Sequence, residues 1–138
     1  MTPRRATRTQ QCDRRDARIR LEHARSFLDV ADLVGTDRDE LATPSVSSAL
    51  AVLSAIAASD AVCCAVLSQR ARGQDHQQSV ALLRTVTPDG PDMARDLERL
   101  LAIKDDAHYG LLDISSQRAT SALRQARRLL AAAEKRVR

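Results

Sequence analysis

The stretch VSSALAVLSAIAASDAVCCAVL, residues 46–67, decides the fold of this chain. It is apolar on nearly every face of a helix, and a helix of that kind lies in the interior of a protein. It continues into SQRARGQDH, residues 68–76, a charged corner where polar side chains meet the core. We expect one central helix from Thr43-Pro44 to about Ala71, because Thr suits a helix cap and Pro the first helical position.

The composition points to an all-α fold. With 138 residues, a single domain is the default expectation. Phe27 and Tyr109 are the only aromatic residues, so the core must consist of Leu, Val, Ile and Ala. Small side chains let helices approach closely, and four Gly and four Pro are too few for a chain of many strands and tight turns.

The segments around the central helix each carry one apolar stripe. Residues 14–34 form an amphipathic helix that Gly35 should end, followed by an acidic linker over residues 36–42. A short helix capped by Asp75 and a helix from about Pro91, fraying near residues 104–110, come next. The final helix begins at Ser115 or Ser116. We therefore predict an antiparallel four- to five-helix bundle over residues 14–138. The stripe of the first helix is Ala17, Leu21, Ala24, Leu28 and Ala31.

Residues 1–13 are basic and almost free of apolar side chains, so we expect a disordered tail. Arg4, Arg5 and Arg8 could bind nucleic acid through its phosphates. The alternative is that the charged residues form solvated helix faces and a basic tail without a specific partner, since net charge says little about specific function.

The sequence predicts a cytoplasmic, reduced protein. The basic start is not followed by an apolar segment of the secretory type, and Ser54, Ser59 and Asp60 interrupt the one stretch that approaches a membrane span. Cys63 and Cys64 are neighbours, point in different directions on a helix and do not suit a bridge to each other. We interpret them as small buried hydrophobic residues.

No metal or cofactor site is expected. The three His are far apart in the sequence, and the adjacent Cys63 and Cys64 lack the spacing of zinc ligands. Gly73 and Gly110 are isolated, so no glycine-rich phosphate loop is present.

Asp60 stands where the apolar stripe of the central helix calls for an apolar residue. It either sits at the edge of the stripe, near solvent or an Arg, or is a partly buried partner for Arg, Lys or His from another helix. Lys104 and His76 are the two partners between which the sequence does not decide.

The corner after the central helix has two interpretations. Arginine side chains beside a helix N-terminus suit an anion, which would make this corner a ligand site. We favour the other interpretation, a helix end, a turn and a cap for the next helix. The residues concerned are Arg70, Arg72, Asp75 and His76.

The segment Lys104-Asp105-Asp106-Ala107-His108-Tyr109-Gly110 carries a resemblance. A basic residue, a polar residue and a His beside an aromatic, just before a capped final helix, resemble the Arg-x4-6-His motif of the HEPN family of small helical bundles. ASDAVCC around Asp60 and RGQDH, residues 72–76, resemble HEPN-like proteins of high-GC bacteria. Lys104 stands where the family has Arg, so the motif is degenerate.

The resemblance implies a helical bundle, commonly a homodimer, whose paired motifs can form an RNA-cleaving site. Carried over, the catalytic candidates are Lys104, Asp105 and His108 or Tyr109. Because the motif is degenerate, we expect a non-catalytic binding or regulatory module for a nucleotide, RNA or protein partner. The first alternative is a metal-independent ribonuclease of toxin–antitoxin type, paired with a nucleotidyltransferase-type protein. The second is a nucleic-acid-binding protein that uses its basic tail.

Overall fold

The computed structural model describes residues 9–36, 44–73, 75–111 and 113–137. The basic tail candidates Arg4, Arg5 and Arg8, most of the expected acidic linker, and Thr43 lie outside these residues. The described chain forms β1 (Thr9–Gln11), α1 (Arg14–Thr36), α2 (Pro44–Leu67), β2 (Gln69–Ala71), α3 (His76–Arg84), α4 (Gly90–Ala102), α5 (Lys104–Tyr109) and α6 (Ser116–Arg136).

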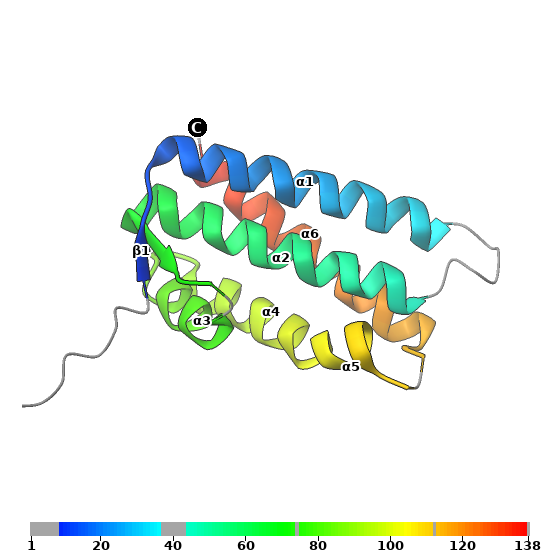
Figure 1. Cartoon of the computed structure of the whole chain (residues 1–138). Coiled ribbons are helices and arrows are strands. Elements are labelled where there is room, and N and C mark those ends of the chain that lie inside the picture. Colours follow the sequence, from blue (N-terminus) through cyan, green and yellow to red (C-terminus); the bar gives the residue numbers. More distant parts are fainter. Residues whose placement is uncertain (1–8, 37–43, 74, 112, 138) are drawn as a thin grey trace, which may run out of the picture.

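The predicted all-α helical bundle is confirmed. In Figure 1, α1 and α4 run in one direction, while α2 and α6 run in the other. The helix expected to fray near residue 104 instead ends at Ala102, and α5 continues after a one-residue break at Ile103. The predicted caps of two helices are also confirmed. Asp75 accepts a hydrogen bond from the Gln78 amide, and Ser115 accepts one from the Arg118 amide.

Helix α2 is the centre of the bundle, since it contacts every other helix and β2. The face it buries completely is built from small residues, including Ala51, Ala55 and Ala58. The larger side chains of Leu50 and Leu53 are half-buried instead. Small side chains let neighbouring helices approach α2 closely, so the larger ones are displaced toward its edges.

The interface between α1 and α2 is held by apolar contact and by two buried hydroxyl groups. All five residues of the predicted α1 stripe are buried. The Ser54 hydroxyl donates to the Ala24 carbonyl oxygen at 2.7 Å, and the Ser47 hydroxyl donates to the Ala31 carbonyl oxygen at 3.0 Å. Because buried polar groups are costly without a partner, these bonds fix the pairing of the two helices.

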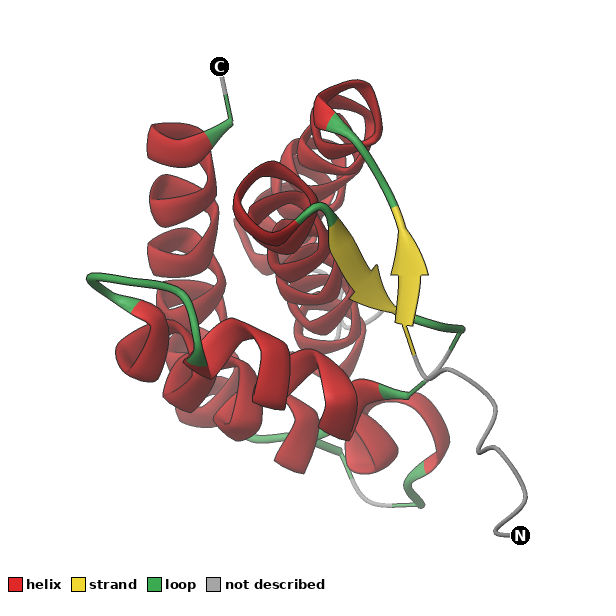
Figure 2. Ribbon diagram, turned by 90° about the vertical axis from the view of Figure 1, so that its left-hand side faces the viewer, coloured by secondary structure: helices red, strands yellow, loops and turns green. Residues whose placement is uncertain are grey.

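Two predictions near the end of α2 are wrong. The helix ends at Leu67 rather than near Ala71, because Ser68 has a positive φ of 56° and turns the chain into β2. The expected disordered tail also starts to be ordered before residue 13. Residues Thr9–Gln11 pair antiparallel with Gln69–Ala71, as Figure 2 shows at one end of the bundle.

The expectation of three reduced cysteines is wrong as well. Cys12 forms a disulfide with Cys64, 52 residues away in the sequence. Cys63 is buried and remains a free thiol, as the sequence indicated. No local spacing indicates the bridge, because it depends on β1 folding back onto the end of α2.

Helix α2 is, by length and composition, apolar enough to cross a membrane, although Ser54, Ser59 and Asp60 interrupt its apolar sequence. In the structure 67% of its most apolar window is buried inside the bundle. A single helix of this kind is weak evidence for a membrane span, because the buried core helix of a water-soluble protein passes the same test.

Candidate functional site

Asp60 is the most buried carboxylate in the described part of the chain and the centre of a polar cluster. One of its oxygens, Oδ2, accepts a hydrogen bond from Arg20 Nε at 3.0 Å and another from Arg70 Nη1 at 3.1 Å. Its side chain is 10% exposed, against 22% for Arg20 and 31% for Arg70. Of the two interpretations of Asp60, the structure confirms the buried partner of an arginine from another helix.

The charge of Asp60 is under opposing influences. Burial raises the pKa of its carboxyl group above the ordinary value, while the positive charges and hydrogen bonds of Arg20 and Arg70 act to lower it. A buried carboxylate of this kind needs both guanidinium groups, because one alone leaves more of the desolvation cost uncompensated.

The two arginines come from distant parts of the chain. Arg20 projects from the second turn of α1, and Arg70 is the middle residue of β2. Because Asp60 lies in the final third of α2, between these elements, it fixes two guanidinium groups side by side on one carboxylate oxygen.

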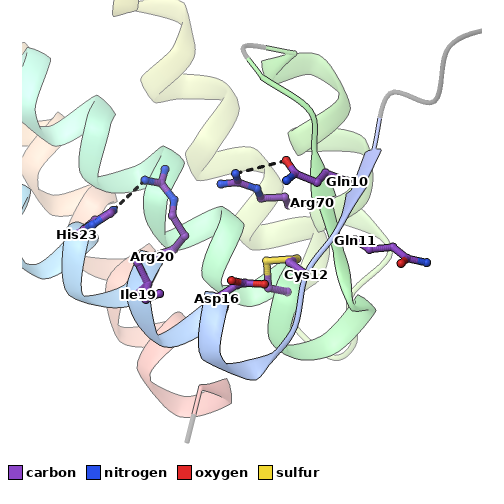
Figure 3. A pocket seen from close by; sticks show the side chains of 9 residues that line it. Gln10, Gln11, Cys12, Asp16, Ile19, Arg20, His23 and Arg70 are labelled. Atoms are coloured by element: carbon purple, nitrogen blue, oxygen red, sulfur yellow. Dashed lines mark hydrogen bonds between the residues drawn. A yellow bond between two sulfur atoms is a disulfide. The ribbon is translucent and has the colours of Figure 1, made fainter.

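A cavity of about 310 Å³ opens next to this pair of arginines. Arg20 and Arg70 line it together with His23, the Cys12–Cys64 disulfide and residues of β1 (Figure 3). The β1 residues are Gln10 and Gln11, and Asp16 and Ile19 of α1 complete the lining.

The arginines keep donors for a ligand after their internal contacts are counted. Arg20 Nη1 lies 3.2 Å from His23 Nδ1, and Arg70 Nη2 donates to Gln10 Oε1 at 3.5 Å. Each guanidinium group has five N–H donors and uses two of them on described residues, which leaves three on each without a partner in that part of the chain. What the arrangement offers chemically is a preorganised pair of cationic donors at the wall of a cavity.

Asp16 contributes a carboxylate elsewhere on the wall. Its Oδ2 accepts a hydrogen bond from the Asp13 amide at 3.0 Å, while Asp13 Oδ1 accepts one from the Asp16 amide at 2.9 Å, which caps the start of α1. Figure 3 shows Asp16 beside the disulfide, apart from the two guanidinium groups.

The predicted corner is divided by the structure. Arg70 belongs to the cavity, whereas Arg72 is exposed and Asp75 caps α3. His76 is the first residue of α3. The interpretation as a turn with a cap therefore holds for Asp75, whereas Arg70 is the one of these four residues that lines the cavity.

His76 lies within electrostatic range of Lys104, the other partner that the sequence offered for Asp60, and of Asp60 itself. Burial and the positive charge of Lys104 lower the pKa of His76, and the negative charges of Asp60 and Asp75 act in the opposite direction. Within the described residues, neither His76 nor Lys104 forms an ion pair with Asp60, whose partners are Arg20 and Arg70. Asp60 therefore pairs with neither of the two residues that the sequence offered, but with the two arginines.

This lowered pKa predicts a loss of stability in acid. The unfolded chain takes up a proton on His76 near pH 6.5, while the folded protein takes it up only at a lower pH. The free energy of unfolding should therefore fall as the pH drops below about 6.5. Urea unfolding at pH 7.5, 6.5 and 5.5 measures the slope, which His76→Gln should flatten. Lys104→Gln should reduce the slope in part, and an unchanged slope in both variants would contradict the assignment.

The segment of residues 104–110, in which we see a resemblance to the HEPN motif, covers α5 and its C-cap. Lys104 and His108 are one turn apart and partly buried, while Asp105 and Tyr109 are exposed, Tyr109 by 77%. The Nε2 atom of His108 is buried and has no hydrogen-bond partner among the described residues. Residues four apart share a helix face, so Lys104 and His108 project on the same side.

Sequence reasoning missed Arg20, His23 and Gln10. Arg20 and His23 occupy the polar face of an amphipathic helix, where charged residues are ordinary, and Gln10 lies in a segment expected to be disordered. The one indication in the sequence was Asp60 itself, which required a cationic partner. Among the described residues, no group of three His, Cys, Asp or Glu side chains is placed to hold a metal ion.

Comparison with protein-family models and with curated proteins finds no match for this chain.

Proposed function

We propose that this protein is a non-catalytic binding module of the HEPN type, which binds a phosphate-bearing ligand of nucleotide size in the cavity beside Arg20 and Arg70. One observation carries the proposal. Two guanidinium groups from distant elements are fixed on the same oxygen of Asp60, at the wall of a cavity of about 310 Å³. Arginine pairs are well suited to phosphate oxygens, because their planar donors form charge-assisted hydrogen bonds.

The size and the lining of the cavity favour a nucleotide over a polymer. Ligand cavities commonly start at about 300 Å³, so this one suits one small molecule. The carboxylate of Asp16, apart from the arginines, offers an acceptor for a hydroxyl group such as those of a ribose. The cytoplasmic location, the homodimer and a nucleotidyltransferase-type partner stay predictions.

Titration calorimetry with adenosine diphosphate, inorganic pyrophosphate and a short single-stranded RNA tests the proposal. Adenosine diphosphate should bind most tightly, and pyrophosphate alone more weakly. Arg70→Gln should weaken binding at least about tenfold, because a hydrogen bond to a charged group contributes about 1.5–3 kcal/mol.

Arg84→Gln is the matched control. Arg84 is an exposed arginine whose partner, Glu98, lies outside the cavity. Its replacement should leave the affinity unchanged. Equal losses in the two variants would show general charge attraction instead of a site, and RNA bound more tightly than the nucleotide would contradict the ligand class.

A metal-independent ribonuclease is the second candidate, and the placement of Lys104 and His108 on one face of α5 favours it. A histidine can take the proton of a ribose 2′-OH while a cation stabilises the charge of the transition state. Incubating RNA with the protein and with a His108→Ala, Tyr109→Phe double variant separates the candidates. Cleavage that the double variant loses would contradict the non-catalytic module.

A further inference from the structure

One wall of the cavity is formed by β1, a strand whose pairing with β2 is too short to be stable without further support. β1 and β2 pair over three residues each, with Gln10 opposite Arg70. Isolated two-stranded sheets are at best marginally stable in water, even when longer. One additional backbone bond, from the Cys12 amide to the Ser68 carbonyl oxygen at 3.1 Å, extends the pairing. The Cys12–Cys64 disulfide links this segment covalently to α2.

The strand in turn positions one of the two arginines. Gln10 accepts a hydrogen bond from Arg70 Nη2, and Gln10, Gln11 and Cys12 all line the cavity. Release of β1 would remove this wall and the partner that orients the Arg70 guanidinium group. The geometry that we propose for phosphate binding therefore needs β1 in place.

The disulfide is open to attack from the cavity. Both Cys12 and Cys64 line the cavity, and Cys12 is partly exposed, whereas Cys64 is 1% exposed. A thiolate that enters would reach the sulfur of Cys12 first. Inside cells, disulfides that persist are commonly redox-sensing or catalytic, because the thiol pool reduces others.

The neighbouring thiol does not compete in the exchange. Cys63 is adjacent to Cys64 in the sequence, but its burial and the nearby negative charge of Asp60 raise the pKa of its thiol to about 12. A thiol that stays protonated is a poor nucleophile toward a disulfide. The bridge therefore opens and closes without exchange to Cys63.

We propose that the Cys12–Cys64 disulfide is a redox switch of the phosphate site: the oxidised protein binds the ligand, and reduction by a dithiol releases β1 and weakens binding. The inference rests on the proposed function of the cavity. In the reaction, a thiolate of the dithiol attacks Cys12 Sγ, the S–S bond breaks, and Cys64 leaves and takes a proton. The second thiol of the reductant resolves the mixed disulfide and frees Cys12, so two electrons and two protons pass to the protein.

The experiment compares the whole 138-residue chain before and after treatment with dithiothreitol. Calorimetry with adenosine diphosphate gives the affinity, and amide hydrogen exchange of residues 10–12 gives the attachment of β1. Reduction should weaken binding by about tenfold, as expected when a site loses its preorganisation. It should also accelerate exchange at residues 10–12, while amides in the middle of α2 stay protected. Circular dichroism verifies that the reduced protein keeps its helices.

Two variants serve as controls. Cys12→Ser should match the reduced protein and ignore dithiothreitol, whereas Cys63→Ala should respond as the wild type does. Binding by the oxidised protein that reduction leaves unchanged would overturn the switch and leave the binding site intact. Exchange at residues 10–12 that ignores reduction would also overturn the switch. If neither the oxidised nor the reduced protein binds adenosine diphosphate, although reduction accelerates exchange at residues 10–12, the proposed function is wrong. The proposed control of ligand binding is then wrong as well.

Discussion

Reduction of the Cys12–Cys64 disulfide is expected to lower the free energy of unfolding by about 4 kcal/mol. The bridge joins residues 52 apart, and closing a loop of that length removes about this much conformational freedom from the unfolded chain. Urea unfolding followed by far-ultraviolet circular dichroism, with and without dithiothreitol, measures the change.

Variants at the cysteines separate the bridge from simple packing. Cys12→Ser should have the stability of the reduced wild type and show no response to dithiothreitol. Cys63→Ala removes a buried sulfur without touching the bridge, so it should cost about 1 kcal/mol and keep the full response to reduction. An unfolding midpoint of the wild type that does not move on reduction would contradict the stabilising role of the disulfide.

Replacing Asp60 by Asn should lower the free energy of unfolding by about 3 kcal/mol at neutral pH. The change keeps the shape of the side chain but leaves Arg20 and Arg70 without a counter-charge in a largely desolvated position. Removing one partner of a buried ion pair costs about 3–5 kcal/mol, and the partial exposure of the arginines places this case at the lower end.

Glu98→Gln is the matched control for this prediction. Glu98 pairs with Arg84 at 3.4 Å, and both side chains are more than half exposed, so its loss should cost less than about 1 kcal/mol. Asp60→Asn should also weaken binding of adenosine diphosphate, because the arginines lose their common anchor. Equal effects of the two substitutions on stability would show that the buried ion pairs of Asp60 contribute no more than an exposed ion pair.

The helices could be predicted because the information that specifies them is local. The α1 stripe from Ala17 to Ala31 repeats every three or four residues, and Asp75 and Ser115 cap the helices that follow them. The end of α2 could not be predicted, since the turn at Ser68 depends on pairing with a strand about 60 residues earlier.

The candidate site could be predicted only at its centre. Asp60 is conspicuous because a carboxylate interrupts an apolar stripe, and this anomaly indicates that a cation must be near. Which cation is near depends on how α1 and β2 are placed against α2. Arg20 and Arg70 are two of many arginines in the chain, and nothing local distinguishes them from the others.

The alanine-lined surface of α2 has a consequence for how this sequence can change over evolution. Four alanines of α2 are completely inaccessible to solvent, so the space around each side chain is filled by its methyl group. They are Ala51, Ala55, Ala58 and Ala61. Replacing one of these alanines by Gly removes only a methyl group, whereas a side chain with two more carbons forces the neighbouring helices apart. Drift at these positions should therefore be confined to Gly, Ser and Ala, while the half-buried leucines at the edges of α2 remain free to exchange with other apolar residues.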